Sequence, residues 1–215
     1  MNAAKDCTLQ EKLLRCAMAL ILAAGALLAS VAASPAYAAP STVDVSIGGK
    51  IPYGGFATTW MSADGNIAYC AEPSSPTPAP GSYSTSPVPS GDVTAAIWYS
   101  FGSPGFDASM FPGSWYDGGG WDDAKYAAAS HVIIAYAYSG SESAATHGTS
   151  PEFASWAKSE LIGGTFARMK AGADKVSAGF EAFCVRTGGG SQTLVSFSWS
   201  AGGVKVAKTD SEAGA

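Results

Sequence analysis

Four side chains suited to covalent or metal chemistry follow residue 38: Cys70, Cys184, His131 and His147. In an extracellular protein, two cysteines most often form one disulfide, and here the bond would join an early strand to a late one. A zinc site made of all four residues is less favoured, because neither a C-x-x-C nor an H-x-x-x-H spacing is present. A thiol protease would need Cys70 next to a histidine base such as His131. No local nucleophile signature surrounds Cys70 to support that alternative.

His131 lies within the segment with the strongest helical pattern. It shares a helix face with Ala127, Ile134 and Tyr138. This spacing favours a buried core histidine over a general base. The aromatic residues of segment 103–121 also have two interpretations, because they either cover the core or present a platform for sugar rings. The glycines and prolines among them favour a covering loop over a flat binding face.

The first 38 residues predict a secretory signal peptide. Basic residues, including Lys12 and Arg15, precede a long apolar run, and the run ends in the small-residue pattern Ala36-Tyr37-Ala38. A transmembrane anchor is disfavoured because the apolar run is short for a span and leads directly into the cleavage pattern. We therefore expect a secreted chain that begins at Ala39 and whose mature domain makes no membrane contact.

The remaining composition is that of one small, acidic domain. The net charge is −5 and charged residues make up 13% of the sequence, which argues against a nucleic-acid partner. The length after residue 38 is enough for one ordinary hydrophobic core.

The elements that must position these residues follow a β, then α, then β order. Alternating strands are predicted over 41–70, with a hairpin turn at Asp64-Gly65. The proline-rich segment 71–91 is predicted to be a surface loop. Helices are expected within three later segments, and two strands joined by a glycine-rich turn follow them; the helical segments are 90–102, 122–140 and 150–164, and the strands 178–187 and 192–203.

This order predicts an α+β fold over residues 39–200. The early and late strands would form a β-rich subdomain, with the helical segment inserted between them. The tail 201–215 has a different character, because "VKVAKTD" alternates like a first strand and has nothing after it to pair with. We expect this tail to be the start of a second domain.

Three short segments together suggest a family. They are "YCAE" around Cys70, "SHVIIAY" at 130–136 and "SQTLVSF" at 191–197. This arrangement resembles the thioester domain of Gram-positive surface adhesins. The wider run from Val43 to Phe197 is similar to the N-terminal region of VaFE-repeat-containing surface-anchored proteins.

The resemblance implies an internal thioester between Cys70 and Gln192. Where the family has Thr-Gln in its middle motif, this chain has Ser130-His131, so His131 would take a supporting role, pointing toward the site and hydrogen-bonding there. The resemblance also implies that 201–215 begins a pilin-like isopeptide repeat, with Lys208 as the cross-linking lysine.

The resemblance further implies a function and a partner. The domain would couple covalently to an amine, such as a lysine of a host or surface protein, without any cofactor. This is single-use chemistry, so the chain is not expected to be an enzyme. The protein would be secreted and attached to the cell wall or surface through a part beyond Ala215, with more repeat domains following. The alternatives are a non-covalent surface binding or stalk-tip module with a Cys70–Cys184 disulfide, and a secreted hydrolase.

Overall fold

The structure is a computed structural model that describes residues 39–200. Six strands and a set of helices make up this part: β1 (Thr42–Tyr53), β2 (Phe56–Ala63), β3 (Asn66–Cys70), β4 (Gly81–Pro87), α2 (Gly91–Tyr99), η1 (Ala108–Met110), α3 (Asp123–Ser139), α4 (Glu142–Ala145), α5 (Pro151–Trp156), η2 (Ala157–Phe166), α6 (Ala167–Ala171), η3 (Ala173–Lys175), β5 (Phe180–Arg186) and β6 (Leu194–Trp199). The expected α+β class is confirmed. The expected signal peptide and the expected start of a repeat lie outside the described residues.

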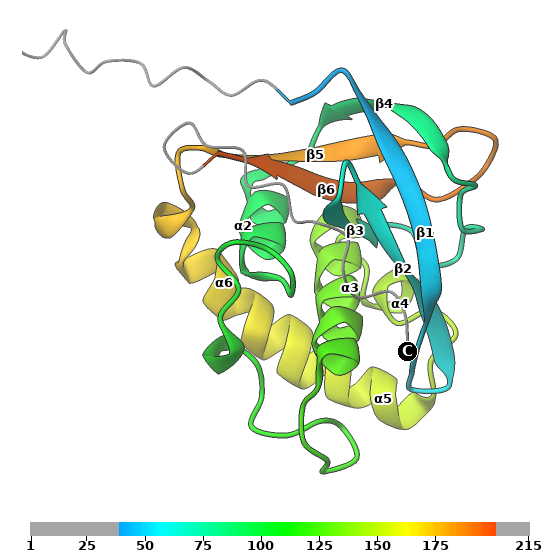
Figure 1. Cartoon of the computed structure of the whole chain (residues 1–215). Helices are drawn as coiled ribbons and strands as arrows, with labels where there is room; N and C mark the ends of the chain where they lie inside the picture. The colour runs from blue at the N-terminus through cyan, green and yellow to red at the C-terminus, as the bar shows by residue number, and fades with distance from the viewer. Residues whose placement is uncertain (1–38, 201–215) are drawn as a thin grey trace, which may run out of the picture. The chain divides into compact units, whose positions relative to one another are not determined.

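The strands form an antiparallel barrel in the order β1-β2-β3-β6-β5-β4, closed by pairing between β1 and β4. Alternate residues of the strands fill its interior: Val43, Val45, Met61, Ala63, Ala68, Cys70, Phe183, Val185 and Leu194. The intervening residues of β3, β5 and β6 face the helices and join a second core there. Helix α3 packs against β1 and β3 (Figure 1). The late strands thus return to the early ones, as the sequence predicts.

The predicted hairpin between β2 and β3 is present. Ala63 pairs with Asn66, so only Asp64 and Gly65 form the turn. Both have positive φ angles, 49° and 77°, which is the geometry of the tight turn whose twist matches its strands. The hairpin sets the register that brings Cys70 to the end of β3.

The prediction that 71–91 is only a surface loop is wrong, because it contains β4. This strand, GSYSTSP, is polar and largely exposed, so it has no apolar alternation for the sequence to reveal. It is nevertheless paired on both sides, with β1 and with β5. The strand is held by backbone pairing rather than by side-chain burial, and it closes the barrel.

Helix α3 has the ends that the sequence predicts. The Asp122 side chain accepts a hydrogen bond from the Lys125 backbone N–H, and Gly140 ends the helix with a φ of 68°. The third predicted helix also begins as expected, with Ser150 as its cap and Pro151 in the first turn. It continues past the predicted end through the π-helical segment η2 into α6.

The aromatic segment 103–121 covers the core. Phe111 and Trp115 are buried, and Trp115 packs its ring against Phe153 and Trp156. The interpretation that this segment covers the core therefore holds, because its buried rings pack against other parts of the domain, including α5.

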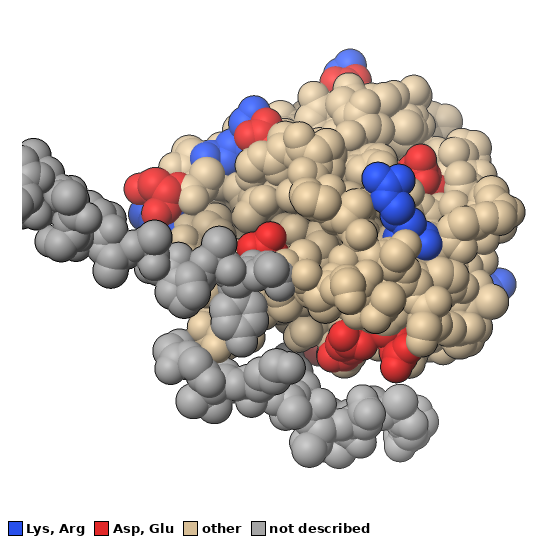
Figure 2. Space-filling model, turned by 90° about the horizontal axis from the view of Figure 1, so that it is seen from above, with Lys and Arg blue, Asp and Glu red and all other residues tan. Residues whose placement is uncertain are grey.

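The surface of the described part carries few charges. Figure 2 shows scattered acidic and basic side chains, mostly near one another, with no broad basic patch on the face in view. Two ion pairs, Lys158–Glu142 and Lys170–Asp92, each measure 2.8 Å and lie in solvent. Within residues 39–200, no helix has the length and apolar character needed to cross a bilayer.

Candidate functional site

Cys70 is the last residue of β3 and faces the interior of the barrel. Its side chain is 3% exposed, and it is paired with Leu194 in the final pair of the β3–β6 ladder. Its sulfur lies 3.8 Å from Thr58 Oγ1. Tyr69, one residue earlier, faces the helices instead, and its hydroxyl donates to the Phe101 carbonyl. Tyr69 therefore anchors β3 from the opposite face.

The structure contradicts a Cys70–Cys184 disulfide. Both cysteines are free and buried. Cys184 pairs with Val195, which pairs with Tyr69, so Cys184 belongs to the row that faces the helices. With β6 between them and strands about 4.8 Å apart, the two Cα atoms are about 10 Å apart, beyond the roughly 7 Å that a disulfide spans. The alternation of strand side chains also points the two sulfurs to opposite faces of the sheet.

Gln192 lies beside Cys70 because the chain leaves the ladder just before Leu194. Its side chain is 3% exposed. Its backbone N–H donates to the Pro76 carbonyl at 3.1 Å, and its side-chain nitrogen donates to Thr77 Oγ1 at 3.4 Å. The Thr187 hydroxyl, just after β5, donates to the Gln192 backbone carbonyl at 2.7 Å. Two contacts thus fix Gln192 against the loop that follows Cys70, and a third fixes it to the end of β5.

A second set of hydrogen bonds joins the segment that follows Cys70 to the segment that follows Gln192. The Ala71 N–H donates to the Thr193 carbonyl at 2.9 Å, and the Thr193 N–H donates to Glu72 Oε2 at 2.9 Å. The residues immediately after Cys70 are therefore tied to the residue immediately after Gln192. This clamp holds the thiol and the carboxamide in one place.

Cys70, Gln192 and His131 line one pocket of about 370 Å³, as does His147. The structure thus brings together the three residues that the sequence analysis selected. His131 is 2% exposed and points from α3 into the pocket. The hydrogen bond expected of His131 is not shown, because its Nε2 atom has no partner. Among the described residues, no group of three or more His, Cys, Asp or Glu side chains is placed to hold a metal ion.

Three residues near Cys70 each have a buried polar atom without a hydrogen-bond partner: Tyr53 (Oη), His131 (Nε2) and Gln192 (Oε1). His131 and Gln192 line the same pocket as Cys70. The Tyr53 ring is tilted by 52° against the His131 ring, with ring centroids 6.0 Å apart, and Tyr53 also lies near Cys70. A buried polar atom without a partner costs about 1–3 kcal/mol. Three of them around one thiol indicate a site arranged for chemistry rather than for packing.

The pocket holds its thiol and imidazole in their neutral forms. Burial raises the pKa of the Cys70 thiol to about 12, against smaller lowering contacts from Thr58 and Gln192. Burial also lowers the pKa of His131 to about 4, and it raises the pKa of the Tyr53 hydroxyl. A neutral imidazole keeps one ring nitrogen free to accept a proton. The site therefore contains a thiol, a carboxamide and a proton acceptor, with no fixed charge among the pocket residues.

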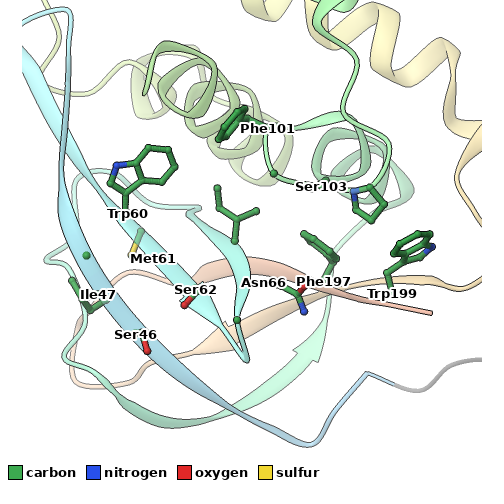
Figure 3. A pocket seen from close by; sticks show the side chains of 15 residues that line it. Ser46, Ile47, Trp60, Met61, Ser62, Asn66, Phe101, Ser103, Phe197 and Trp199 are labelled. Carbon is green, nitrogen blue, oxygen red and sulfur yellow. The ribbon is translucent and has the colours of Figure 1, made fainter. Parts of the chain in front are cut away.

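A larger cleft of about 580 Å³ lies elsewhere in the domain. Figure 3 shows Trp60 and Met61 of β2, Phe197 and Trp199 of β6, and Phe101 around it. Its remaining lining residues are small, apolar or uncharged. None of them is a nucleophile of the thiol type or an ionisable group, so this cleft offers a surface for contact and no covalent chemistry.

The sequence analysis missed several residues that surround Cys70. Thr58, Glu72 and Thr77 are ordinary polar residues whose contacts depend on the register of distant strands. Tyr53 precedes the Gly54-Gly55 turn between β1 and β2, and that turn was the one available signal for its position at the end of a strand. Finding these residues from the sequence would require knowing which strands are neighbours and in which register they pair.

Comparison with known proteins gives one family. A family model described as "Thioester domain" matches residues 42–163, which is more than half of the chain. The matched range contains Cys70 and His131 and ends before Gln192, whose place in the site rests on the geometry above. No curated protein and no solved structure matches the chain.

Proposed function

The chain belongs to the thioester domain family, and from this premise we propose that Cys70 and Gln192 form an internal thioester that couples the domain to amines. The single observation that carries this assignment is the enclosure of the Cys70 thiol and the Gln192 carboxamide in one pocket, clamped through Glu72 and Thr193. The carboxamide oxygen has no hydrogen-bond partner, so the amide is not stabilised as a packing group would be.

Formation of the bond needs no other reactant. The Cys70 sulfur attacks the Gln192 side-chain carbon, the carbon–nitrogen bond breaks, and ammonia leaves with the thiol proton. Because burial raises the thiol pKa to about 12, the proton must leave as the sulfur attacks. The unpartnered Nε2 of neutral His131 is the acceptor that the pocket offers for it, which is the supporting role we assign to His131.

The thioester would then react once with a primary amine. The amine nitrogen bonds to the Gln192 carbon, the carbon–sulfur bond breaks, and Cys70 regains its thiol. Burial of both residues supports the persistence of the bond in water until a target arrives. Since the acyl group is consumed, the domain acts as a covalent adhesin and not as an enzyme with turnover.

We infer a setting that fits this chemistry. The domain would be secreted through the signal peptide expected at 1–38 and displayed on a Gram-positive cell wall or surface. Its target would be a lysine amine on a host or surface protein. The low share of charged residues, 13% of the sequence, supports recognition through shape and covalent capture rather than through electrostatic attraction.

Intact mass of the mature domain tests the proposal. The wild-type protein is expected to lack the mass of one ammonia, and incubation with methylamine should add the amine at Gln192 and expose one thiol at Cys70. Cys70→Ala and Gln192→Ala should each abolish both changes, whereas Ser143→Ala, an exposed change outside the pocket, should alter neither. A wild-type mass that equals the unmodified sequence would refute the thioester.

A further inference from the structure

Both histidines of the sequence line the Cys70–Gln192 pocket. They lie at different depths, because His131 is 2% exposed on the pocket floor and His147 is exposed at its rim. The formation of the thioester involves only groups on the floor. His147 therefore stands where a molecule entering from solvent would meet the pocket first.

The position of His147 is fixed by its loop. Its backbone N–H donates to the Ala144 carbonyl at 3.3 Å, and its ring lies edge-on to Phe56 with centroids 6.3 Å apart. Gly148 follows with a φ of +74°, and a Cβ there would lie 2.6 Å from Phe56 Cδ2. The glycine thus allows the loop to dock closely on Phe56, which itself lines the pocket.

Coupling needs a proton acceptor for a group that is absent during formation, the incoming amine. A lysine-type amine has a pKa of about 10.4 and arrives protonated, so it must lose protons before its nitrogen can end as an amide. The residues that line the pocket include no Asp, Glu, Lys or Arg. The two imidazoles are therefore the proton-accepting side chains among the lining residues, and His147 is the exposed one.

We propose that His147 is the general base of the coupling step, taking a proton from the incoming amine at the rim of the pocket. The inference rests on the proposed function. The nitrogen–carbon bond forms and the carbon–sulfur bond of the thioester breaks. The ammonium group loses two protons on becoming an amide: the Cys70 sulfur finally takes up the one that His147 removes, and the other leaves to solvent. His131 is less suited to this step, because it is 2% exposed and its ring packs against Tyr53.

The test compares coupling rates of His147→Gln and wild type, with thioester content measured first by intact mass. Methylamine is the protonated probe and hydroxylamine is a probe that is largely unprotonated at neutral pH. His147→Gln should form the thioester fully yet couple methylamine about 100-fold more slowly, within the range of general-base effects. The loss with hydroxylamine should be much smaller, and added imidazole should restore part of the methylamine rate.

A matched control and two contrary outcomes complete the experiment. Ser143→Ala changes an exposed residue of the same region outside the pocket and should couple both probes at the wild-type rate. If His147→Gln coupled methylamine as fast as wild type, or lost equal rate with both probes and ignored imidazole, His147 would not be the base. Absence of the thioester in wild type would instead refute the proposed function itself, so the two failures are distinct.

Discussion

Gln192 lies two residues before Leu194, the partner of Cys70 in the last pair of the β3–β6 ladder. The ladder ends there, so Gln192 is free of strand pairing. It is held instead by the backbone carbonyl of Pro76 and the side-chain hydroxyl of Thr77. A residue still inside the ladder would alternate to one face or the other. Release at this point lets the Gln192 side chain enter the pocket that the Cys70 side chain already lines.

The clamp between Glu72 and Thr193 should control how readily the thioester forms. Glu72→Ala removes the carboxylate that accepts the Thr193 N–H bond at 2.9 Å, a charge-assisted contact of about 1.5 kcal/mol, so formation should slow by about tenfold. Intact mass followed over time after expression or refolding measures this rate.

Glu72→Gln is the control, because its side-chain oxygen retains an acceptor at the same place. It should form the thioester at nearly the wild-type rate. Equal rates for Glu72→Ala and wild type would mean that the remaining Ala71–Thr193 bond alone holds the two loops together.

His131 should make the domain less stable in acid. Burial lowers its folded pKa to about 4, whereas an unfolded histidine titrates near 6.5. Below about pH 6.5 the unfolded state binds a proton that the folded state does not, so stability falls with pH until about pH 4. The loss between pH 7 and pH 4.5 should be about 2–3 kcal/mol from this one group.

Urea unfolding at the two pH values measures that loss. Cys70→Ala is the suitable background, because without the thiol no cross-link can complicate refolding. Adding His131→Gln should remove most of the pH 7 to pH 4.5 difference, since glutamine does not titrate. An unchanged difference would assign the acid sensitivity to other groups.

Much of this architecture follows from local sequence, and the remainder from pairing at a distance. Asp64-Gly65 specifies a hairpin turn through positive φ angles, and Asp122 and Gly140 mark the ends of α3, because each acts within a few residues. The polar β4 carries no such signal, since its place depends on the backbone edges of β1 and β5.

The site divides in the same way. Cys70 and Gln192 were selectable as a pair of reactive types with family motifs around them, and the structure places them in one pocket. The disulfide alternative was equally consistent with composition, and only strand register separates Cys70 from Cys184. The sequence did not assign Tyr53 and His147 to the thioester site. Tyr53 reaches it at the turn between β1 and β2, and His147 reaches it just after the short helix α4, far along the chain.

The close contact of Gly148 with Phe56 should matter for coupling and not for bond formation. Gly148→Ala places a Cβ 2.6 Å from Phe56 Cδ2 at a φ of +74°, a backbone strain of about 1 kcal/mol or more, so the loop with His147 should shift. Thioester content by mass should stay at the wild-type level while the methylamine rate falls severalfold. Gly118→Ala has the same kind of strain at a φ of +81°, with open space around it and outside the pocket, and should leave the methylamine rate unchanged.

Cys184 should be dispensable for the chemistry although it is buried as deeply as Cys70. Its side chain is 4% exposed and packs among the residues that face the helices, and burial raises its pKa to about 11, so it is an unreactive apolar group. Cys184→Ala should cost about 1 kcal/mol of stability through the small cavity it leaves. The variant should still lack the mass of one ammonia and couple methylamine at the wild-type rate. Thiol titration of the unfolded wild-type protein before any amine is added should find Cys184 reduced, whereas a mass deficit of two hydrogens that disappears in Cys184→Ala would restore the disulfide and overturn the strand register described here.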